Sequence, residues 1–215
     1  MFMSSTLGLV VTVSTSRGVR AYHHGDLRAA LVEAGLSALA ATSLEEISLR
    51  QIARDVGVSA TAVYRHFPDK RALLSAMADA GVQRLGEAQQ AAARAAAPRE
   101  MFAATGRAYV RFALANPALF RLAFTHGSAH PGTVFGDSLA GRMLQDFSAR
   151  YTSTPEAARR LVVQSWALVH GLAMLMLDGR LPNDEGLIDQ VVDPENLFAL
   201  HPQTAQVERT SPPVV

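Results

Sequence analysis

The run SLRQIARDVGVSATAVYRHFPDKRALL, residues 48–74, carries closely spaced signals for helix starts and helix ends. Ser48, with Gln51 three residues later, predicts a capping box, in which both side chains bond backbone N–H groups at a helix start. Gly57 fits the left-handed position that ends a helix, and Ser59 is a favoured N-cap for the next. Asp69, placed after a proline that stops the second helix, predicts the start of another. The run therefore predicts two short helices joined by a tight turn and followed by a third helix.

Apolar residues at three- and four-residue spacing predict helices along most of the remaining chain. Alanine is abundant, and no convincing strand pattern follows residue 20, so the predicted fold class is all-α. The other expected helices run from residue 26 to about 41, 69 to 96, 99 to 116, 118 to 125, 134 to 151, 155 to 179 and 185 to 200.

A short helix ending at Gly57, a turn and a second short helix have the form of a helix-turn-helix, whose second helix enters the DNA major groove. Thr61 stands near the exposed start of that second helix, and Tyr64 and His66 can donate hydrogen bonds to phosphates. Lys70 follows in the first turn of the next helix, where backbone N–H groups favour an anion. An ordinary helical hairpin in a core is the alternative, but this gathering of polar side chains favours DNA.

The composition restricts the kinds of function that the chain can have. A net charge of +1 over 215 residues requires any nucleic-acid contact to come from a local patch. With no cysteine, and with an apolar run at 7–13 too short to span a membrane, we expect a cytoplasmic protein without membrane contact. No metal site is expected, because His126 and His130 fall in a loop without a third ligand. No enzyme activity or cofactor is expected, because the sequence has no Gly-rich phosphate loop after a strand, no H-E-x-x-H and no nucleophile elbow.

Two segments resemble a known family. The helix of HHGDLRAALVEAGLSAL, followed by SLRQIARDVGVSATAVYRHFPDKRALLSAM, resembles the DNA-binding domain of TetR-family transcriptional regulators over about residues 22–77, most specifically in GVS…VYRHFPDKRALL. SWALVHGLAMLMLDGRL, residues 165–181, resembles the C-terminal regulatory domain named for its Trp-His-Gly residues, here Trp166, His170 and Gly171. We expect a flexible N-terminal extension at 1–21, a helix-turn-helix domain at 22–70, a linker helix at 71–97, an effector-binding and dimerisation domain at 98–200 and a disordered tail at 201–215.

The resemblance implies an all-α homodimer that binds a double-stranded DNA operator and holds an unknown small-molecule effector in its larger domain. Ala60 stands where other members place a larger hydrogen-bonding side chain, so base reading would rest on Thr61 and on methyl contacts with thymine. The candidate DNA-binding residues are Ser48, Arg50, Ser59, Ala60, Thr61, Tyr64, His66 and Lys70; within this set the resemblance assigns phosphate contacts to Ser59, Tyr64, His66 and Lys70 and base-reading positions to Arg50, Ala60 and Thr61.

The stretch 157–177 is apolar nearly all the way round, so it is expected to be buried on several faces. One face against a partner subunit and another lining a pocket would explain it, and a central core helix of a monomer is the alternative. His170 belongs to the pocket set, although a hydrogen-bonded core histidine is the favoured interpretation. The candidate pocket residues are Phe102, Tyr109, Phe112, Phe120, Phe124, Met143, Phe147, Trp166, His170 and Met174, and the candidate dimer-interface residues are Leu161, Leu168, Leu172 and Leu175.

These patterns predict a DNA-binding transcriptional regulator, and specifically a repressor that a small hydrophobic or amphipathic ligand releases from a pseudo-palindromic operator. The choice of repression follows from the common habit of the family and from no residue here. The alternative is a dimeric DNA-binding regulator without a small-molecule effector, either constitutive or controlled by a protein partner. An apolar pocket beside His170 would favour the first function, and a tightly filled core there would favour the second.

Overall fold

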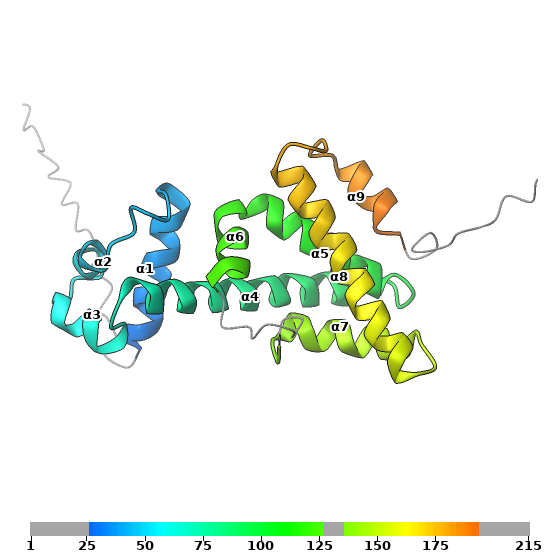
Figure 1. The fold of residues 1–215 in the computed structure, drawn as a ribbon, viewed down its shortest axis with the longest axis horizontal. Helices are drawn as coiled ribbons and strands as arrows, with labels where there is room; N and C mark the ends of the chain where they lie inside the picture. Colours follow the sequence, from blue (N-terminus) through cyan, green and yellow to red (C-terminus); the bar gives the residue numbers. More distant parts are fainter. Residues whose placement is uncertain (1–25, 127–135, 194–215) are drawn as a thin grey trace, which may run out of the picture.

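The computed structural model describes residues 26–126 and 136–193, and in those two ranges the chain forms nine helices and no strand (Figure 1). The all-α prediction is therefore confirmed. The expectations for the N-terminal extension, for His130 and for the C-terminal tail lie outside the described residues. The helices are α1 (Leu27–Ala41), α2 (Leu49–Val56), α3 (Ala60–His66), α4 (Lys70–Ala95), α5 (Met101–Ala115), α6 (Pro117–His126), α7 (Leu139–Arg150), α8 (Pro155–Leu177) and α9 (Glu185–Val191).

The predicted helix ends around α2 and α3 are confirmed with one exception. Gly57 has the left-handed φ of 79° that ends α2, Ser59 Oγ accepts from the Ala62 N–H at 3.2 Å, and Asp69 Oδ1 accepts from the Ala72 N–H at 2.7 Å. The capping box at the start of α2 is wrong, because the Ser48 side chain makes no capping bond. The Gln51 side chain instead bonds Asp55 and Arg54 on the exposed side of the same helix, as expected for partners three and four residues apart.

Two predicted helices are shorter than expected. The helix expected from residue 134 begins at Leu139, because Ser138 caps it by accepting from the Gly141 N–H at 3.1 Å. The helix expected at 185–200 ends at Val191, and residues beyond 193 lie outside the described part of the chain.

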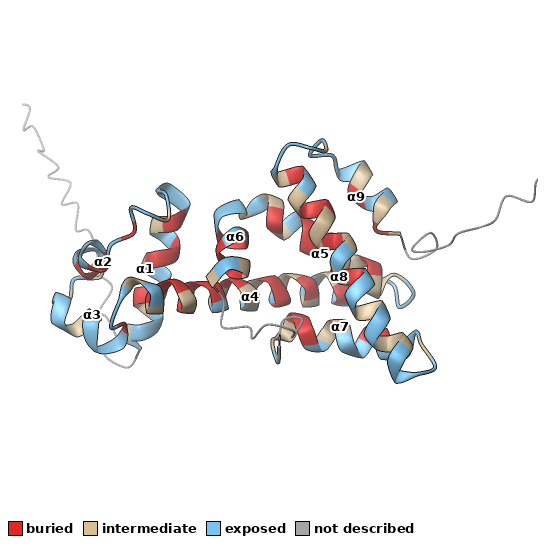
Figure 2. Cartoon of the chain, in the orientation of Figure 1, coloured by how far each residue is buried: buried red, intermediate tan, exposed pale blue. Residues whose placement is uncertain are grey.

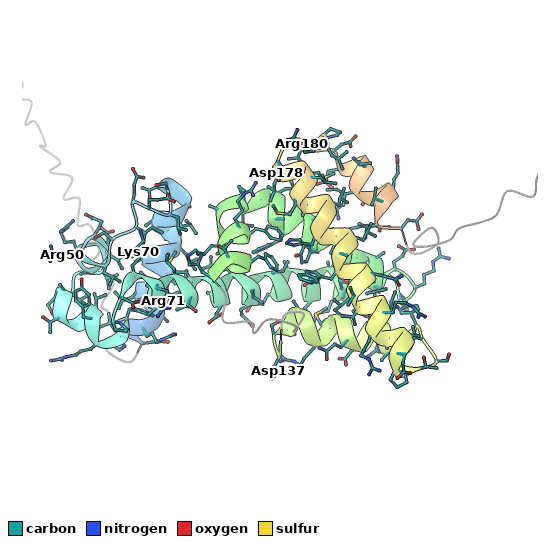
Figure 3. All side chains as sticks on the ribbon, viewed as in Figure 1. Arg50, Lys70, Arg71, Asp137, Asp178 and Arg180 are labelled. Atoms are coloured by element: carbon teal, nitrogen blue, oxygen red, sulfur yellow. The ribbon has the colours of Figure 1, made fainter. Side chains whose placement is uncertain are left out.

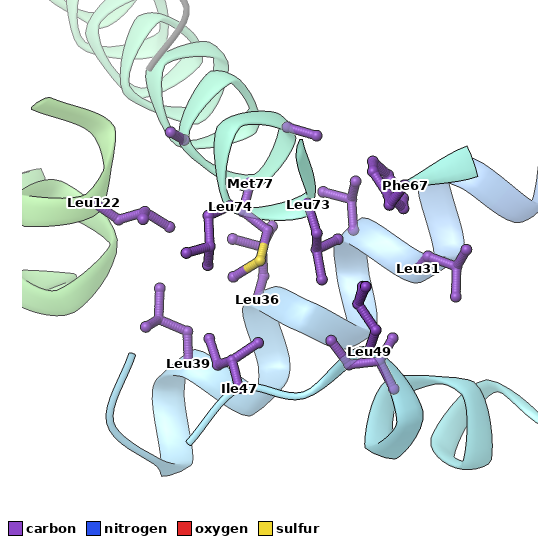
Figure 4. Packing of buried hydrophobic residues seen from close by; sticks show 14 of the residues in the cluster. Leu31, Leu36, Leu39, Ile47, Leu49, Phe67, Leu73, Leu74, Met77 and Leu122 are labelled. Atoms are coloured by element: carbon purple, nitrogen blue, oxygen red, sulfur yellow. The ribbon is translucent and has the colours of Figure 1, made fainter. Parts of the chain in front are cut away.

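The first hydrophobic core lies where the start of α4 packs against α1, α2 and α3 (Figure 4). Leu31, Phe67 and Leu73 are almost completely buried there. Met77 packs closely on α1, since a Cβ added to Gly35 would come within 2.7 Å of the Met77 sulfur. Leu122 of α6 joins the same cluster, so the second half of the chain packs directly on α1 and on the start of α4.

The second core is built by α5, α6, α8 and α9, with Leu85 contributed by α4. Tyr109, Phe120 and Ile188 are fully buried in it. Because α4 contributes to both cores, this helix of 26 residues joins the two halves of the molecule (Figure 1).

Helix α8 has a buried side and an uncovered side (Figure 2). Val169, Leu172 and Met176 are buried in the second core, whereas Val163 is 55% exposed and Leu175 46% exposed. By length and composition alone α8 could cross a membrane, but its buried residues belong to the protein core. Of the several buried faces expected for α8, the single chain therefore covers only one side.

Candidate functional site

Helices α2 and α3 lie at one end of the molecule, and one side of each remains open to solvent (Figures 1 and 2). Val63 of α3 and Phe67 after it are buried, which fixes the opposite side of α3 outward. Seven of the eight candidate DNA-binding residues are exposed, namely Ser48, Arg50, Ser59, Ala60, Thr61, Tyr64 and His66, and Lys70 is half-buried. These eight residues lie on α2, on α3 or next to them and are accessible to solvent, and we call them together the α2–α3 surface.

Lys70 has a structural partner that its place in the sequence did not indicate. Its Nζ donates to the backbone carbonyl of Glu45 at 2.8 Å, which ties the start of α4 to the loop between α1 and α2. Lys70 is labelled in Figure 3. An ammonium group has three N–H donors, so this bond engages one of them. Lys70 can therefore hold the loop and still present its charge beside the α2–α3 surface.

Sequence reasoning missed four arginines near this surface. Arg54, Arg65 and Arg71 are exposed on α2, α3 and α4, and Arg28 of α1 lies over the Phe67 ring at 5.2 Å. The basic pair in PDKR, residues 68–71, could have indicated Arg71, but only Lys70 of this pair was predicted to contact DNA. These side chains add cationic charge next to the exposed hydroxyls of α3, a combination that suits phosphate contacts.

A second candidate site is a cavity of about 180 Å³ that is partly open to solvent and is lined by α4, α5, α7 and α8, with Val192 at its edge. Phe102, Tyr109, Met143 and Trp166 from the candidate pocket set line it. Six other candidates do not line it and pack elsewhere, namely Phe112, Phe120, Phe124, Phe147, His170 and Met174. Sequence reasoning missed several lining residues, among them Gln89, Thr105, Leu144, Tyr151 and Ser165.

His170 lies in an aromatic cluster beside the cavity. Its Nδ1 is 2.8 Å from the Tyr109 hydroxyl, which also accepts from the Trp166 Nε1–H at 3.3 Å. The rings of Phe120 and Phe124 approach it at centroid distances of 5.6 and 4.8 Å. Desolvation lowers the pKa of His170 and raises the pKa of the Tyr109 phenol. A neutral imidazole whose Nδ1 accepts a hydrogen bond from the neutral phenol O–H agrees with both shifts, so this cluster is a packed, hydrogen-bonded wall.

The four leucines proposed for a dimer interface occupy three different environments. Leu161 and Leu168 line the cavity, Leu172 is buried in the second core, and only Leu175 is exposed. The uncovered side of α8 instead carries Val163, Ala167, Gly171 and Leu175, which recur every four residues on one face of the helix. A Cβ added to Gly171 would meet no atom within 4 Å, so this face is open along its middle.

Two family models match most of the described chain. The model described as "Bacterial regulatory proteins, tetR family" matches residues 31–77, and that described as "Tetracyclin repressor-like, C-terminal domain" matches residues 102–198. Together these matches cover more than half of the chain, and they fall on the two halves that share α4. The chain belongs to the TetR family. This TetR-family protein is a DNA-binding transcriptional regulator, which confirms the function class predicted from the sequence.

Solved structures share the fold of this TetR-family protein. A Rhodococcus sp. RHA1 protein of unknown function is 34% identical, with 83% of this chain and 96% of that chain covered and a TM-score of 0.63. A tetR-family transcriptional regulator from Streptomyces coelicolor is 23% identical, with 79% of each chain covered and a TM-score of 0.58. A TetR family transcription regulator from Marinobacter aquaeolei VT8 is 22% identical, with 77% of this chain and 91% of that chain covered and a TM-score of 0.56.

Proposed function

We propose that this protein is a homodimeric, cytoplasmic repressor that leaves its operator when a small hydrophobic or amphipathic molecule fills the cavity. The observation that carries the proposal is the cavity itself, which is mostly apolar and is walled partly by α4. A regulator without a small-molecule effector would have no use for such a space, so the cavity favours the ligand-responsive role. Aromatic rings fill the space around His170 itself. Tyr109 and Trp166, which belong to the same hydrogen-bonded cluster, line the cavity and would contact the ligand directly.

Helix α4 gives the ligand a route to the DNA-binding end. It begins at Lys70, beside the α2–α3 surface, and reaches the cavity at Gln89, which at 1.5 Å per residue is about 28 Å along the helix. A ligand can move α4 only if it binds the protein more tightly when α4 stands in one place than in another. Only such a difference in affinity shifts the population between the two states. We therefore place the regulatory movement in α4.

The open face of α8 is the proposed dimer contact. Val163 and Leu175 are large apolar side chains left exposed in the single chain, and Ala167 and Gly171 between them allow a second helix to approach closely. Two copies paired there would present their two α3 helices to successive major grooves of the DNA. In such dimers the two half-sites are about 34–36 Å apart, which is one turn of the double helix. We also propose that the regulatory domain is of the Trp-His-Gly type, since Trp166 and His170 both bond Tyr109.

Selection of bound duplexes from a random pool tests the proposal as a whole. The recovered sites should contain two inverted half-sites about one helical turn apart, because a symmetric dimer reads a pseudo-palindrome. Recovery of a single half-site, or of no preferred sequence, would contradict the proposed dimeric operator complex.

Loss of a phosphate contact should weaken binding to every duplex alike. We expect Tyr64→Phe and Lys70→Ala each to lower affinity for specific and random DNA by a similar factor, and Lys70→Ala to reduce the salt slope by about 1. Fluorescence anisotropy across a salt series measures both effects. Arg94→Ala, which removes an exposed charge at the distant end of α4, is the control. A changed base preference with unchanged affinity would place these residues against bases instead.

Thr61 is expected to read bases. Thr61→Ala should relax sequence preference at one or two positions of each half-site, at a cost of about 1 kcal/mol per contact, because its hydroxyl and methyl both face the groove in the proposed complex. Repeating the selection with the variant measures this, and Thr125→Ala on α6 serves as control. An unchanged selected-sequence profile would remove Thr61 from base reading.

A further inference from the structure

Two buried polar atoms, in residues that line the cavity, have no hydrogen-bond partner. They are Gln89 Oε1 on α4 and Ser165 Oγ on α8, and the two residues are only 9% and 7% exposed. A buried polar atom without a partner costs free energy, and such atoms are uncommon in native proteins. Both atoms belong to residues that line the same cavity, which makes a bound molecule the natural source of the missing bonds.

The orientation of the Gln89 amide decides which kind of group it needs. Its Nε2 donates to the backbone carbonyl of Thr105 at 3.2 Å. A carbonyl oxygen can only accept, so the nitrogen of the amide must face Thr105, and the unpartnered atom must be the oxygen. The bound molecule must therefore offer a donor to Gln89, while the Ser165 hydroxyl can act as donor or acceptor.

Apart from Tyr151, which is exposed to solvent, the other polar side chains of the wall already have partners. The Thr105 hydroxyl donates to the Phe102 carbonyl at 2.7 Å. Tyr109 and Trp166 bond each other, and Tyr109 also bonds His170. Among the described lining residues, Gln89 and Ser165 are thus the two with buried side-chain atoms that remain to be satisfied.

The cavity also selects against charge. The described residues that line it include no Asp, Glu, Lys or Arg, so an ionised ligand would be buried without a counter-charge at a large cost. Its volume of about 180 Å³ is slightly larger than the roughly 150 Å³ of an apolar protein cavity known to take benzene. Phe102 and Trp166 offer aromatic surfaces against which a flat ring can pack.

We infer that the cavity binds an uncharged, largely apolar molecule of about one substituted ring, whose hydroxyl or equivalent donor bonds Gln89 Oε1 and whose polar end also meets the Ser165 hydroxyl. This inference rests on the proposed ligand-responsive function and names the ligand chemistry. Gln89 belongs to α4 and bonds α5 through Thr105, and Ser165 belongs to α8. One polar group of the ligand thereby bridges α4 and α8, which an apolar molecule of the same shape cannot do.

The test compares three probes of one shape on the purified full-length protein at pH 7: 4-propylphenol, propylbenzene and 4-propylbenzoate. The phenol is neutral at this pH, because a phenolic pKa is near 10, and the benzoate is an anion. Calorimetry or ligand-observed NMR should show that the phenol binds about fivefold more tightly than propylbenzene, the size of one net hydrogen bond, and that the benzoate binds at least about tenfold more weakly than the phenol.

Substitution of the glutamine should remove the preference. In Gln89→Leu the phenol and propylbenzene should bind equally, with propylbenzene affinity retained, whereas the control Gln83→Leu on the exposed side of α4 should bind as wild type. Ser165→Ala should reduce the preference for 4-propylphenol over propylbenzene by about twofold. Because it is a smaller change, it still tests the inference if Gln89→Leu fails to fold. Equal binding of phenol and propylbenzene by the wild type, tighter benzoate binding, or no binding of any probe would overturn the inference.

A separate measurement keeps this inference distinct from the proposed function. DNA affinity is measured by anisotropy with saturating 4-propylphenol. A Gln89-dependent preference without any change in DNA affinity would support the ligand chemistry and overturn the ligand-responsive role. Release of DNA by propylbenzene and 4-propylphenol at equal concentrations would overturn the ligand chemistry and support the role.

Discussion

Val163→Glu is expected to separate the dimer and to lower operator affinity by about 100-fold or more. The substitution places a charge on the open apolar face of α8, at the end of that face where Val163 is 55% exposed in the single chain. A charge buried against a second apolar helix has no partner, so pairing becomes unfavourable. Once the subunits separate, each half-site is bound by a single DNA-binding domain. The increase in affinity that comes from joining two such domains, on the order of 10²–10⁴, is then lost. Sedimentation equilibrium gives the assembly state, and anisotropy with the selected operator gives the affinity.

The control for this experiment is Gln145→Glu, which adds the same charge at an exposed position of α7. It should leave a folded dimer with operator affinity close to that of the wild type. Leu175→Glu provides a second substitution on the same face of α8, and it should reproduce the effect of Val163→Glu. A Val163→Glu protein that sediments as a dimer and binds the operator at full affinity would place the subunit contact on another surface.

Gly86→Val is expected to lower the free energy of unfolding by about 3 kcal/mol. A Cβ at Gly86 would lie 2.9 Å from the backbone nitrogen of Ala140 and 2.9 Å from Leu139 Cβ, where α4 and α7 cross. A backbone atom cannot rotate away as the end of a side chain can, so α7 must shift, and such overpacking typically costs about 1–3 kcal/mol or more. Urea unfolding followed by circular dichroism measures the loss.

Ala91→Val is the matched control, because position 91 is exposed on the same helix. It should lose less than about 1 kcal/mol, the helix-propensity cost of a β-branched residue. Gly86→Val should also weaken binding of 4-propylphenol, since Ala140 and Met143 of α7 line the cavity. Equal stability losses in the two variants would mean that α4 and α7 do not need this close approach.

Signals within a few residues were sufficient for the DNA-binding half. Gly57, Ser59 and Asp69 act on their own backbone neighbours, so their roles do not depend on the rest of the fold. The capping box at Ser48 failed for a local reason as well, because Gln51 has competing partners on its own helix. The exposure of Tyr64 and Thr61 follows from the burial of Val63 between them, which helical periodicity predicts.

The cavity could be predicted only in part. Phe102 and Phe120 are both apolar aromatic residues at helical spacing, yet one lines the cavity and the other fills the core. Gln89 and Ser165 were missed because polar residues on helices are usually exposed. A signal for Gln89 was present, since Leu85 and Ala93, four residues away on either side, are apolar and share its face.

The sequence by itself determined the helices, the end of α2, the starts of α3 and α4 and the surface that α3 presents, because these follow from interactions between residues close along the chain. Only the tertiary structure decided which side of α8 is buried. An apolar helix has no preferred direction when it is hydrophobic nearly all round, since burial is favourable on any face. The packing of α5 and α7 against one side sends Leu168 to the cavity and Leu172 to the core, and it leaves Val163 and Leu175 exposed.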